Sequence, residues 1–169
     1  MSPINEITRH YKIIIELVKT AFSEAQSIGI NNLLQPGLVK EMIISDALGH
    51  TLITTKRDAD AHKTGNPTIK YEYLSCKEGG MGQLDRMFKS PPENRTQSLE
   101  RIKRNHSIFF AVFDKNDQIK ILRIYEILPS VLIAETERKL DNSKNDISHV
   151  GFSEKWAREN GKRVFVNSD

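Results

Sequence analysis

The chain has 169 residues, the usual size of one domain with one hydrophobic core. Hydrophobic residues make up 38% and charged residues 28%, and the formal net charge is only +3, so the chain as a whole is not a polycation. The single cysteine, Cys76, excludes an internal disulfide framework and a cysteine-based zinc site.

The first residues lack the basic region and the uninterrupted apolar region of a signal peptide. No window of the sequence approaches the roughly 20 apolar residues needed to span a bilayer. A single cysteine is also consistent with a reducing compartment. We therefore expect a cytoplasmic protein with no membrane partner.

Two helices are predicted at the beginning of the chain. Apolar residues recur at steps of three and four over residues 4–28, and Gly29 is a natural end for that helix. The residues of this stripe are Ile7, Tyr11, Ile14, Ile15, Val18, Phe22 and Ala25. A second helix follows residues 36–37 and ends at Gly49, before the β-rich segment of residues 51–55.

The segment from Lys56 to Lys77 predicts a β-hairpin that carries charged side chains. Asp58 and Asp60 end one strand-like segment, residues 64–67 form a turn, and Lys77 ends the returning strand. Folding this hairpin brings carboxylates and an ammonium group together at one edge of a sheet. Carboxylates bind hard divalent cations such as Mg²⁺, and a nearby lysine can orient a water or stabilise charge on a phosphate. The hairpin therefore predicts metal-assisted phosphodiester hydrolysis.

The rest of the chain alternates between helices and strands. The predicted elements are a Gly-rich connector at 79–82, a short helix at 83–89, a basic helix at 96–105, strands at 108–113 and 118–127, a helix from 129 to 140, a polar loop at 141–146, a segment bearing Trp156, and a strand at 163–166. This order predicts an α/β (α+β) fold around a mixed sheet flanked by helices. One helix is expected to cross between the hairpin and the later strands.

Basic residues are concentrated in one part of the sequence. Six of them fall within 19 positions: Arg86, Lys89, Arg95, Arg101, Lys103 and Arg104. Such clustering is suited to a polyanionic partner, and these side chains are predicted to contact DNA phosphates. The alternative is an ordinary solvated helix face.

The order of these motifs resembles that of the PD-(D/E)xK nucleases, and among them the small type II restriction endonucleases of the Pvu II type. The resemblance covers most of the chain. Besides the hairpin, it rests on residues 29–35, the apolar helix 38–44, the strand 108–113, residues 146–149, Lys155-Trp156 and residues 161–165.

This resemblance implies a restriction-endonuclease-like core and Mg²⁺-dependent, sequence-specific cleavage of double-stranded DNA by a homodimer. It divides a single nuclease domain, residues 1–169, into a helical dimerisation part (4–48), a catalytic sheet (50–127) and a recognition loop with the C-terminal segment (141–166). Ser148 and His149 match places where this branch reads base edges, and both residue types can donate and accept hydrogen bonds.

The chain departs from the family pattern at Ser75, which stands where the family has an acid two residues before the lysine. The expected catalytic residues are Asp58, Asp60, Ser75 and Lys77, with either aspartate as the first metal ligand. Residues that could supply the missing carboxylate are Glu78, Asp85, Glu93 and Glu41; metal ligands are therefore sought among Asp58, Asp60, Glu78 and Glu93. Glu72 lies on the other strand face from Lys77 and would need a bulge or twist to join them.

Other functions stay open on the sequence. A repair or junction-resolving nuclease would use the same fold and the same chemistry. A non-catalytic DNA-binding module with a decayed site would account for Ser75. In that case Lys77 would be a solvated lysine at the end of a strand.

Overall fold

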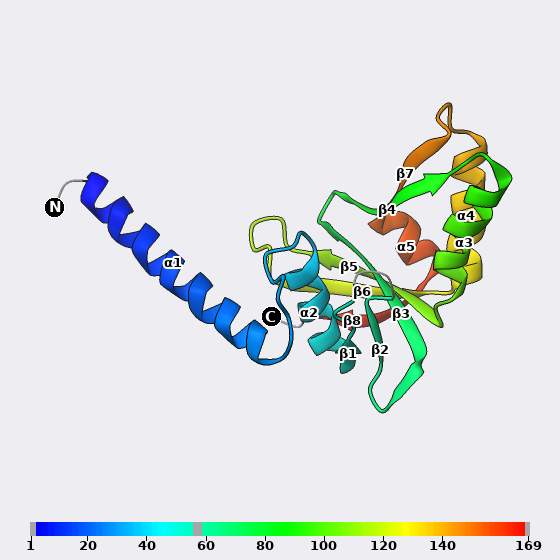
Figure 1. Ribbon diagram of the computed structural model, residues 1–169. Helices are drawn as coiled ribbons and strands as arrows, with labels where there is room; N and C mark the ends of the chain where they lie inside the picture. Colours follow the sequence, from blue (N-terminus) through cyan, green and yellow to red (C-terminus); the bar gives the residue numbers. More distant parts are fainter. Residues whose placement is uncertain (1–2, 56–58, 168–169) are drawn as a thin grey trace. The chain divides into compact units, whose positions relative to one another are not determined.

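The computed structural model describes residues 3–55 and 59–167 of the chain, with side chains from Glu6 onward. It divides into two compact units, Met1–Val39 and Lys40–Asp169, which are described separately (Figure 1). Asp58, one of the two expected metal ligands of the hairpin, lies outside the described residues.

The first unit is dominated by helix α1, Pro3–Ser27, which confirms the helix predicted for residues 4–28. Gly29 ends it with a φ of +83°, and the N–H of Ile30 donates to the carbonyl of Ala25 at 2.8 Å. Most of the predicted apolar stripe is exposed in this unit; Ile7, Tyr11 and Ile14 are each more than half exposed. Helix α2, Leu38–Leu48, continues into the second unit and confirms the second predicted helix.

A mixed sheet forms the centre of the second unit. Among the described residues it has six strands in the order β1-β2-β3-β5-β6-β8. Their bounds are β1 His50–Leu52, β2 Ala61–Lys63, β3 Asn66–Lys77, β5 Ser107–Phe113, β6 Ile121–Ile127 and β8 Lys162–Val166. β3 and β5 are parallel, and the other neighbours are antiparallel. Helices flank this sheet, so the α/β class and the mixed sheet are confirmed.

The chain leaves β3, forms β4 (Met81–Phe88) and α3 (Pro92–Lys103), and returns as β5. The predicted crossing helix between the hairpin and the later strands is therefore confirmed as α3. After β6 come α4 (Pro129–Asp141), β7 (Ile147–Ser153) and α5 (Glu154–Asn160). β4 and β7 pair antiparallel as a separate two-stranded sheet (Figure 1).

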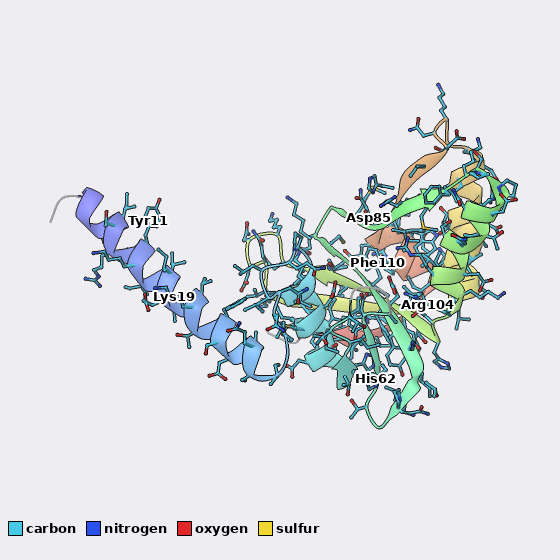
Figure 2. All side chains as sticks on the ribbon, viewed as in Figure 1. Tyr11, Lys19, His62, Asp85, Arg104 and Phe110 are labelled. Atoms are coloured by element: carbon cyan, nitrogen blue, oxygen red, sulfur yellow. The ribbon has the colours of Figure 1, made fainter. Side chains whose placement is uncertain are left out.

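The six-stranded sheet is packed on both faces, because its central strands alternate apolar side chains between two cores. All seven positions of β5 are buried. Phe109, Ala111 and Phe113 join Ile44 of α2 on one face. Phe110, which Figure 2 labels, belongs to the other core, which residues of α3, α4, β4 and β7 also form.

Two predicted elements were wrong. Residues 83–89 were expected to be helical but form most of β4, where Gly82, Leu84 and Met87 are buried and the intervening residues are exposed. Gly82 packs so tightly on the sheet that an added Cβ would lie 2.8 Å from Phe110. Ser148 and His149 were expected in a loop but lie on strand β7. In β4 the bulge at Asp85 and Arg86 breaks the alternation, and in β7 only Val150 and Phe152 are buried, so neither segment has a clear strand pattern in the sequence.

Candidate functional site

The hairpin brings Asp60 opposite Glu72. β2 and β3 are antiparallel with Ala61 opposite Tyr71, and continuing this register pairs Asp60 with Glu72. The N–H of Asp60 donates to the carbonyl of Tyr71 at 3.0 Å. The Asp60 carboxylate in turn accepts from the N–H of Tyr73 at 2.7 Å. Asp60 therefore caps the edge of β3 where its pairing with β2 ends.

Tyr73 fixes this edge from the other side. Its hydroxyl lies 3.1 Å from the Ser45 hydroxyl on α2 and 2.8 Å from Nδ1 of His50 on β1. The ring of Tyr73 is buried, as is Ser45. The strand that carries Glu72 is thereby tied to α2 and β1 by one side chain, which holds the backbone around Asp60 in place.

Glu41 of α2 is the third carboxylate of this group. Burial raises the pKa of Glu41 to about 7, and the negative charge of Asp60 adds to the effect. Burial also raises the pKa of Asp60, against the opposing effects of the Tyr73 N–H and the Arg104 charge. Glu72 has a raised pKa for the same reason, burial, followed by the charges of Asp60 and Glu41. Three acids, one from α2, one just before β2 and one from β3, therefore repel one another where burial limits their solvation.

Two arginines accompany these acids. Arg104 follows the last turn of α3 (Figure 2), and its charge lowers the pKa of both Asp60 and Glu72. Arg101, one turn earlier, lowers the pKa of Glu72 and lines a small cavity with it. In the described part of the chain, the Oε2 atom of Glu72 is buried and has no hydrogen-bond partner. We call Glu41, Asp60, Glu72, Arg101 and Arg104 the carboxylate cluster.

The donor set of the carboxylate cluster fits a hard divalent cation. Mg²⁺ and Mn²⁺ take carboxylate oxygens, and a cation would both offset the mutual repulsion and satisfy the unpaired oxygen of Glu72. Within residues 3–55 and 59–167, however, no three His, Cys, Asp or Glu side chains already form a metal-binding group. Binding would therefore require the three carboxylates to draw together.

The structure does not bring Lys77 to these acids. Lys77 ends β3 and pairs with Phe113, five residues beyond Glu72, which is about 16 Å along a strand. Ser75 lies between them on the same strand face as Lys77. The bulge or twist needed to place Glu72 beside Lys77 is absent from the described pairing of β3 with β5, whose register is continuous.

Glu78 and Glu93 are also distant from Asp60. Glu78 follows Lys77 and pairs with Arg123 at 3.1 Å. Glu93 is in the first turn of α3, about 16 Å along the helix axis from Arg104 at its other end. Neither joins the carboxylate cluster, whereas Glu41, which the sequence left as an alternative, does.

The predicted phosphate-binding residues either make contacts within the fold or lie at its surface. Lys89 and Arg95 make contacts within the fold: Lys89 donates to the carbonyl of Ser143 at 2.7 Å, and Arg95 of α3 pairs with Asp141 of α4 at 2.7 Å. Lys103 is exposed and pairs with Glu100 of its own helix at 3.0 Å. Arg86 and Arg101 line a groove of about 160 Å³ between β4 and α3.

The two-stranded sheet carries the residues expected to read bases. Leu84 lies opposite Val150 and Met87 opposite Ser148, so Asp85 and Arg86 form a bulge opposite His149. The bulge places Arg86 at a φ of +52°. Asp85 (Figure 2) and Nδ1 of His149 are 2.8 Å apart and both are exposed. The hydroxyl of Ser148 lies 2.8 Å from that of Ser143.

Sequence reasoning left Glu72 apart from Lys77 and did not place it beside Asp60. The hairpin turn alone would not have found its role, because a turn at residues 64–65 pairs Lys63 with Asn66 and, if continued, Asp60 with Ile69. The register shift between His62 and Lys63 is what brings Asp60 opposite Glu72. The proximity of Arg104 to both acids had no signal in the sequence, because it depends on the path of α3 over the sheet.

No family model matches the chain, and no curated protein matches it. Among the residues that the structure describes, no helix is both long enough and apolar enough to cross a bilayer.

Proposed function

We propose that this protein is a divalent-cation-dependent endonuclease acting on double-stranded DNA, with the carboxylate cluster as its active site. The observation that carries this proposal is the electrostatic coupling of Glu41, Asp60 and Glu72, all with raised pKa values, under the influence of the Arg101 and Arg104 charges. Burying several carboxylates near one another is unfavourable, so such a group is a candidate functional site. With arginines beside it, the group is suited to a metal and a phosphate.

Each residue of the cluster has a role in phosphodiester hydrolysis. A bound Mg²⁺ supplies Lewis-acid chemistry, which lowers the pKa of a water and neutralises phosphate charge. Asp60 and Glu72 would hold the cation. Glu41 would either complete the ligand set as a carboxylate or, when it is not bound to the cation, use its raised pKa to take a proton from the attacking water or return one to the leaving oxygen. Arg104 and Arg101 stabilise the charge that grows on the phosphate in the transition state.

DNA binding is assigned to the neighbouring surface. Arg86, Arg101 and Lys103 contact phosphates and position the duplex. The β4–β7 sheet has the width of a two-stranded ribbon, which the major groove of B-DNA admits, and it presents Asp85, Ser148 and His149. This arrangement supports a sequence-specific enzyme, a type II restriction endonuclease in a cytoplasmic restriction system.

A homodimer completes the proposal. One small subunit covers about half of a duplex site, so cutting both strands favours two-fold symmetry. The apolar stripe of α1 recurs at alternating steps of four and three, as in Ile7, Tyr11, Ile14 and Val18, and these side chains are exposed. Pairing of two such stripes across a two-fold axis would bury them.

One observation favours a second function, a non-catalytic DNA-binding module. The family pattern places a lysine two residues after the second acid. If Glu72 is that acid, the position belongs to Leu74, which is buried in the core. In an active enzyme Arg101 and Arg104 must take the part of that lysine; in an inactive one they serve only to bind phosphate.

The test is incubation of the protein with phage DNA and Mg²⁺, compared with Asp60→Asn and with Asp46→Asn. Asp46 is an exposed acid on α2 and is the matched control. Discrete fragments from the wild type and the control, with none from Asp60→Asn, support the restriction enzyme. A smear indicates a nuclease without site preference, and DNA binding with no cutting in Mg²⁺ or Mn²⁺ supports the non-catalytic module.

A further inference from the structure

A second charged site lies at the opposite end of β3 from the carboxylate cluster. It is a cavity of about 530 Å³ between the turn after β3, strands β6 and β8, and helix α5. The turn lies seven residues beyond Glu72 along the chain, roughly 20 Å for a strand of that length. Cavities of about 300–1,000 Å³ are the usual size for small-molecule sites, so a nucleotide would fit in this one.

Cationic side chains dominate the cavity wall. Four of the described lining residues are basic, Arg123, Lys155, Arg158 and Arg163, and the one acidic lining residue is Glu154. Glu154 is already engaged: it accepts from Nε of Arg123 at 2.5 Å, from Nη2 at 3.2 Å, and from the Tyr125 hydroxyl at 3.1 Å. The remaining cations therefore have no acid of their own within the lining.

Arg123 is held in a fixed orientation. Its guanidinium donates from Nε and Nη2 to the Glu154 carboxylate, and Nη2 also donates to Glu78 at 3.1 Å. These bonds leave Nη1 without an acceptor among the described residues. An oriented guanidinium with a free donor is suited to an anion, because no side-chain entropy is lost when the ligand binds.

Arg158 and Arg163 come from different elements, α5 and β8, and both are exposed. Within the described residues neither has a carboxylate at ion-pair distance; Lys155 has one, Glu159, only at 4.0 Å. At the mouth, Gly79 has a φ of +74°, and an added Cβ at Gly80 would lie 3.0 Å from the Lys77 carbonyl. The positive φ of Gly79 favours glycine, the space at Gly80 is tight for a side chain, and the two glycines leave that side of the cavity without side chains.

We propose that this cavity binds a phosphate-bearing ligand, with Arg158 and Arg163 contacting the phosphate and Arg123 supplying a preoriented donor. Phosphate is the ligand chemistry that several guanidinium groups and few acids recognise best. The volume leaves room for the rest of a nucleotide, either free or part of a nucleic-acid strand. The proposal is independent of catalysis at the carboxylate cluster.

The experiment is isothermal titration of the full chain, without divalent cation and at low salt, with inorganic phosphate, with a deoxynucleoside 5′-monophosphate and with a 24-base-pair duplex. The test variant is Arg158→Gln/Arg163→Gln. The control variant, Lys12→Gln/Lys63→Gln, removes the same charge from exposed positions that do not line the cavity. All of these substituted side chains are exposed, so each variant is expected to fold, which thermal unfolding checks.

We expect the test variant to lose at least tenfold affinity for the monophosphate, while the control stays within twofold of the wild type. If the duplex loses affinity in parallel, the natural ligand belongs to a nucleic-acid strand; if duplex binding follows the control, the ligand is a free nucleotide. Either result supports the site. Absence of saturable binding by the wild type at millimolar phosphate and monophosphate, or equal losses in test and control variants, overturns it.

Discussion

Replacing Glu72 by glutamine tests the carboxylate cluster without any substrate. Burial and the charges of Asp60 and Glu41 raise the pKa of Glu72 from 4.5 to about 8. Between those two values the folded state keeps a proton that the unfolded chain releases. The free energy of unfolding therefore falls as the pH rises from 4.5 to 8, and below 4.5 the penalty is absent. Glu72→Gln removes this penalty and should remove most of the slope.

The expected size follows from 1.36 kcal/mol per pKa unit, which gives about 4–5 kcal/mol for the whole change in the pKa of Glu72. Asp60 and Glu41 titrate together with it and share part of that energy. We therefore expect Glu72→Gln to be about 2–4 kcal/mol more stable than the wild type at pH 8 and about equal to it at pH 4.5.

The assay is urea unfolding followed by circular dichroism, at several pH values and with a chelator present. Glu93→Gln is the control, because Glu93 is exposed and far from the cluster; its curve should run parallel to that of the wild type. With Mg²⁺ at ten times its dissociation constant, the wild type should gain about 1.4 kcal/mol and Glu72→Gln clearly less. A glutamine variant that is less stable than the wild type at pH 8 without metal would refute the reasoning.

Four further predictions follow from the same geometry. Arg104→Gln should lower the single-turnover cleavage rate about 10²-fold with little loss of DNA affinity. Lys77→Ala, at the far end of β3, should cleave within a few-fold of the wild-type rate, and the reverse pattern would restore Lys77 as the catalytic cation. Mg²⁺ affinity should rise from pH 6 to pH 8, because the acids must lose their protons first, and titration in buffers of different ionisation enthalpy should show proton release. His149→Ala should cost roughly 1–3 kcal/mol on the cognate duplex alone, while Arg86→Ala should weaken cognate and random duplexes equally and reduce the salt slope by about one, as binding across a salt series will show. Ile14→Asp should convert a dimer to a monomer in light scattering, whereas Lys12→Gln should not.

The sequence predicted most of the fold because its strongest patterns are local. A local pattern is enough to predict several elements without reference to the rest of the chain. Such patterns are the apolar stripe from Ile7 to Ala25, the turn at residues 64–67 and the fully apolar strand 108–113. β4 and β7 were missed because the bulge at Asp85 and Arg86 interrupts the alternation of β4, and β7 has few buried positions, so each depends on pairing with the other. Gly82 and His149 have no strand signal of their own, and only their positions against Phe110 and Asp85 explain them.

The carboxylate cluster includes Asp60 of the predicted hairpin but not Lys77, and the reason is geometric. Alternation along β3 separates Glu72 from Lys77, and a planar sheet would also separate Glu72 from Glu41 on the helix beyond the other face. Asp60 removes that separation, because β2 begins at Ala61 and, among the described residues, its pairing with β3 does not reach Tyr73. The Asp60 carboxylate fills that edge and is reached from α2 on one side and from α3 on the other. A site at a sheet edge can thus draw residues from both faces, which a pattern read along one strand does not reveal.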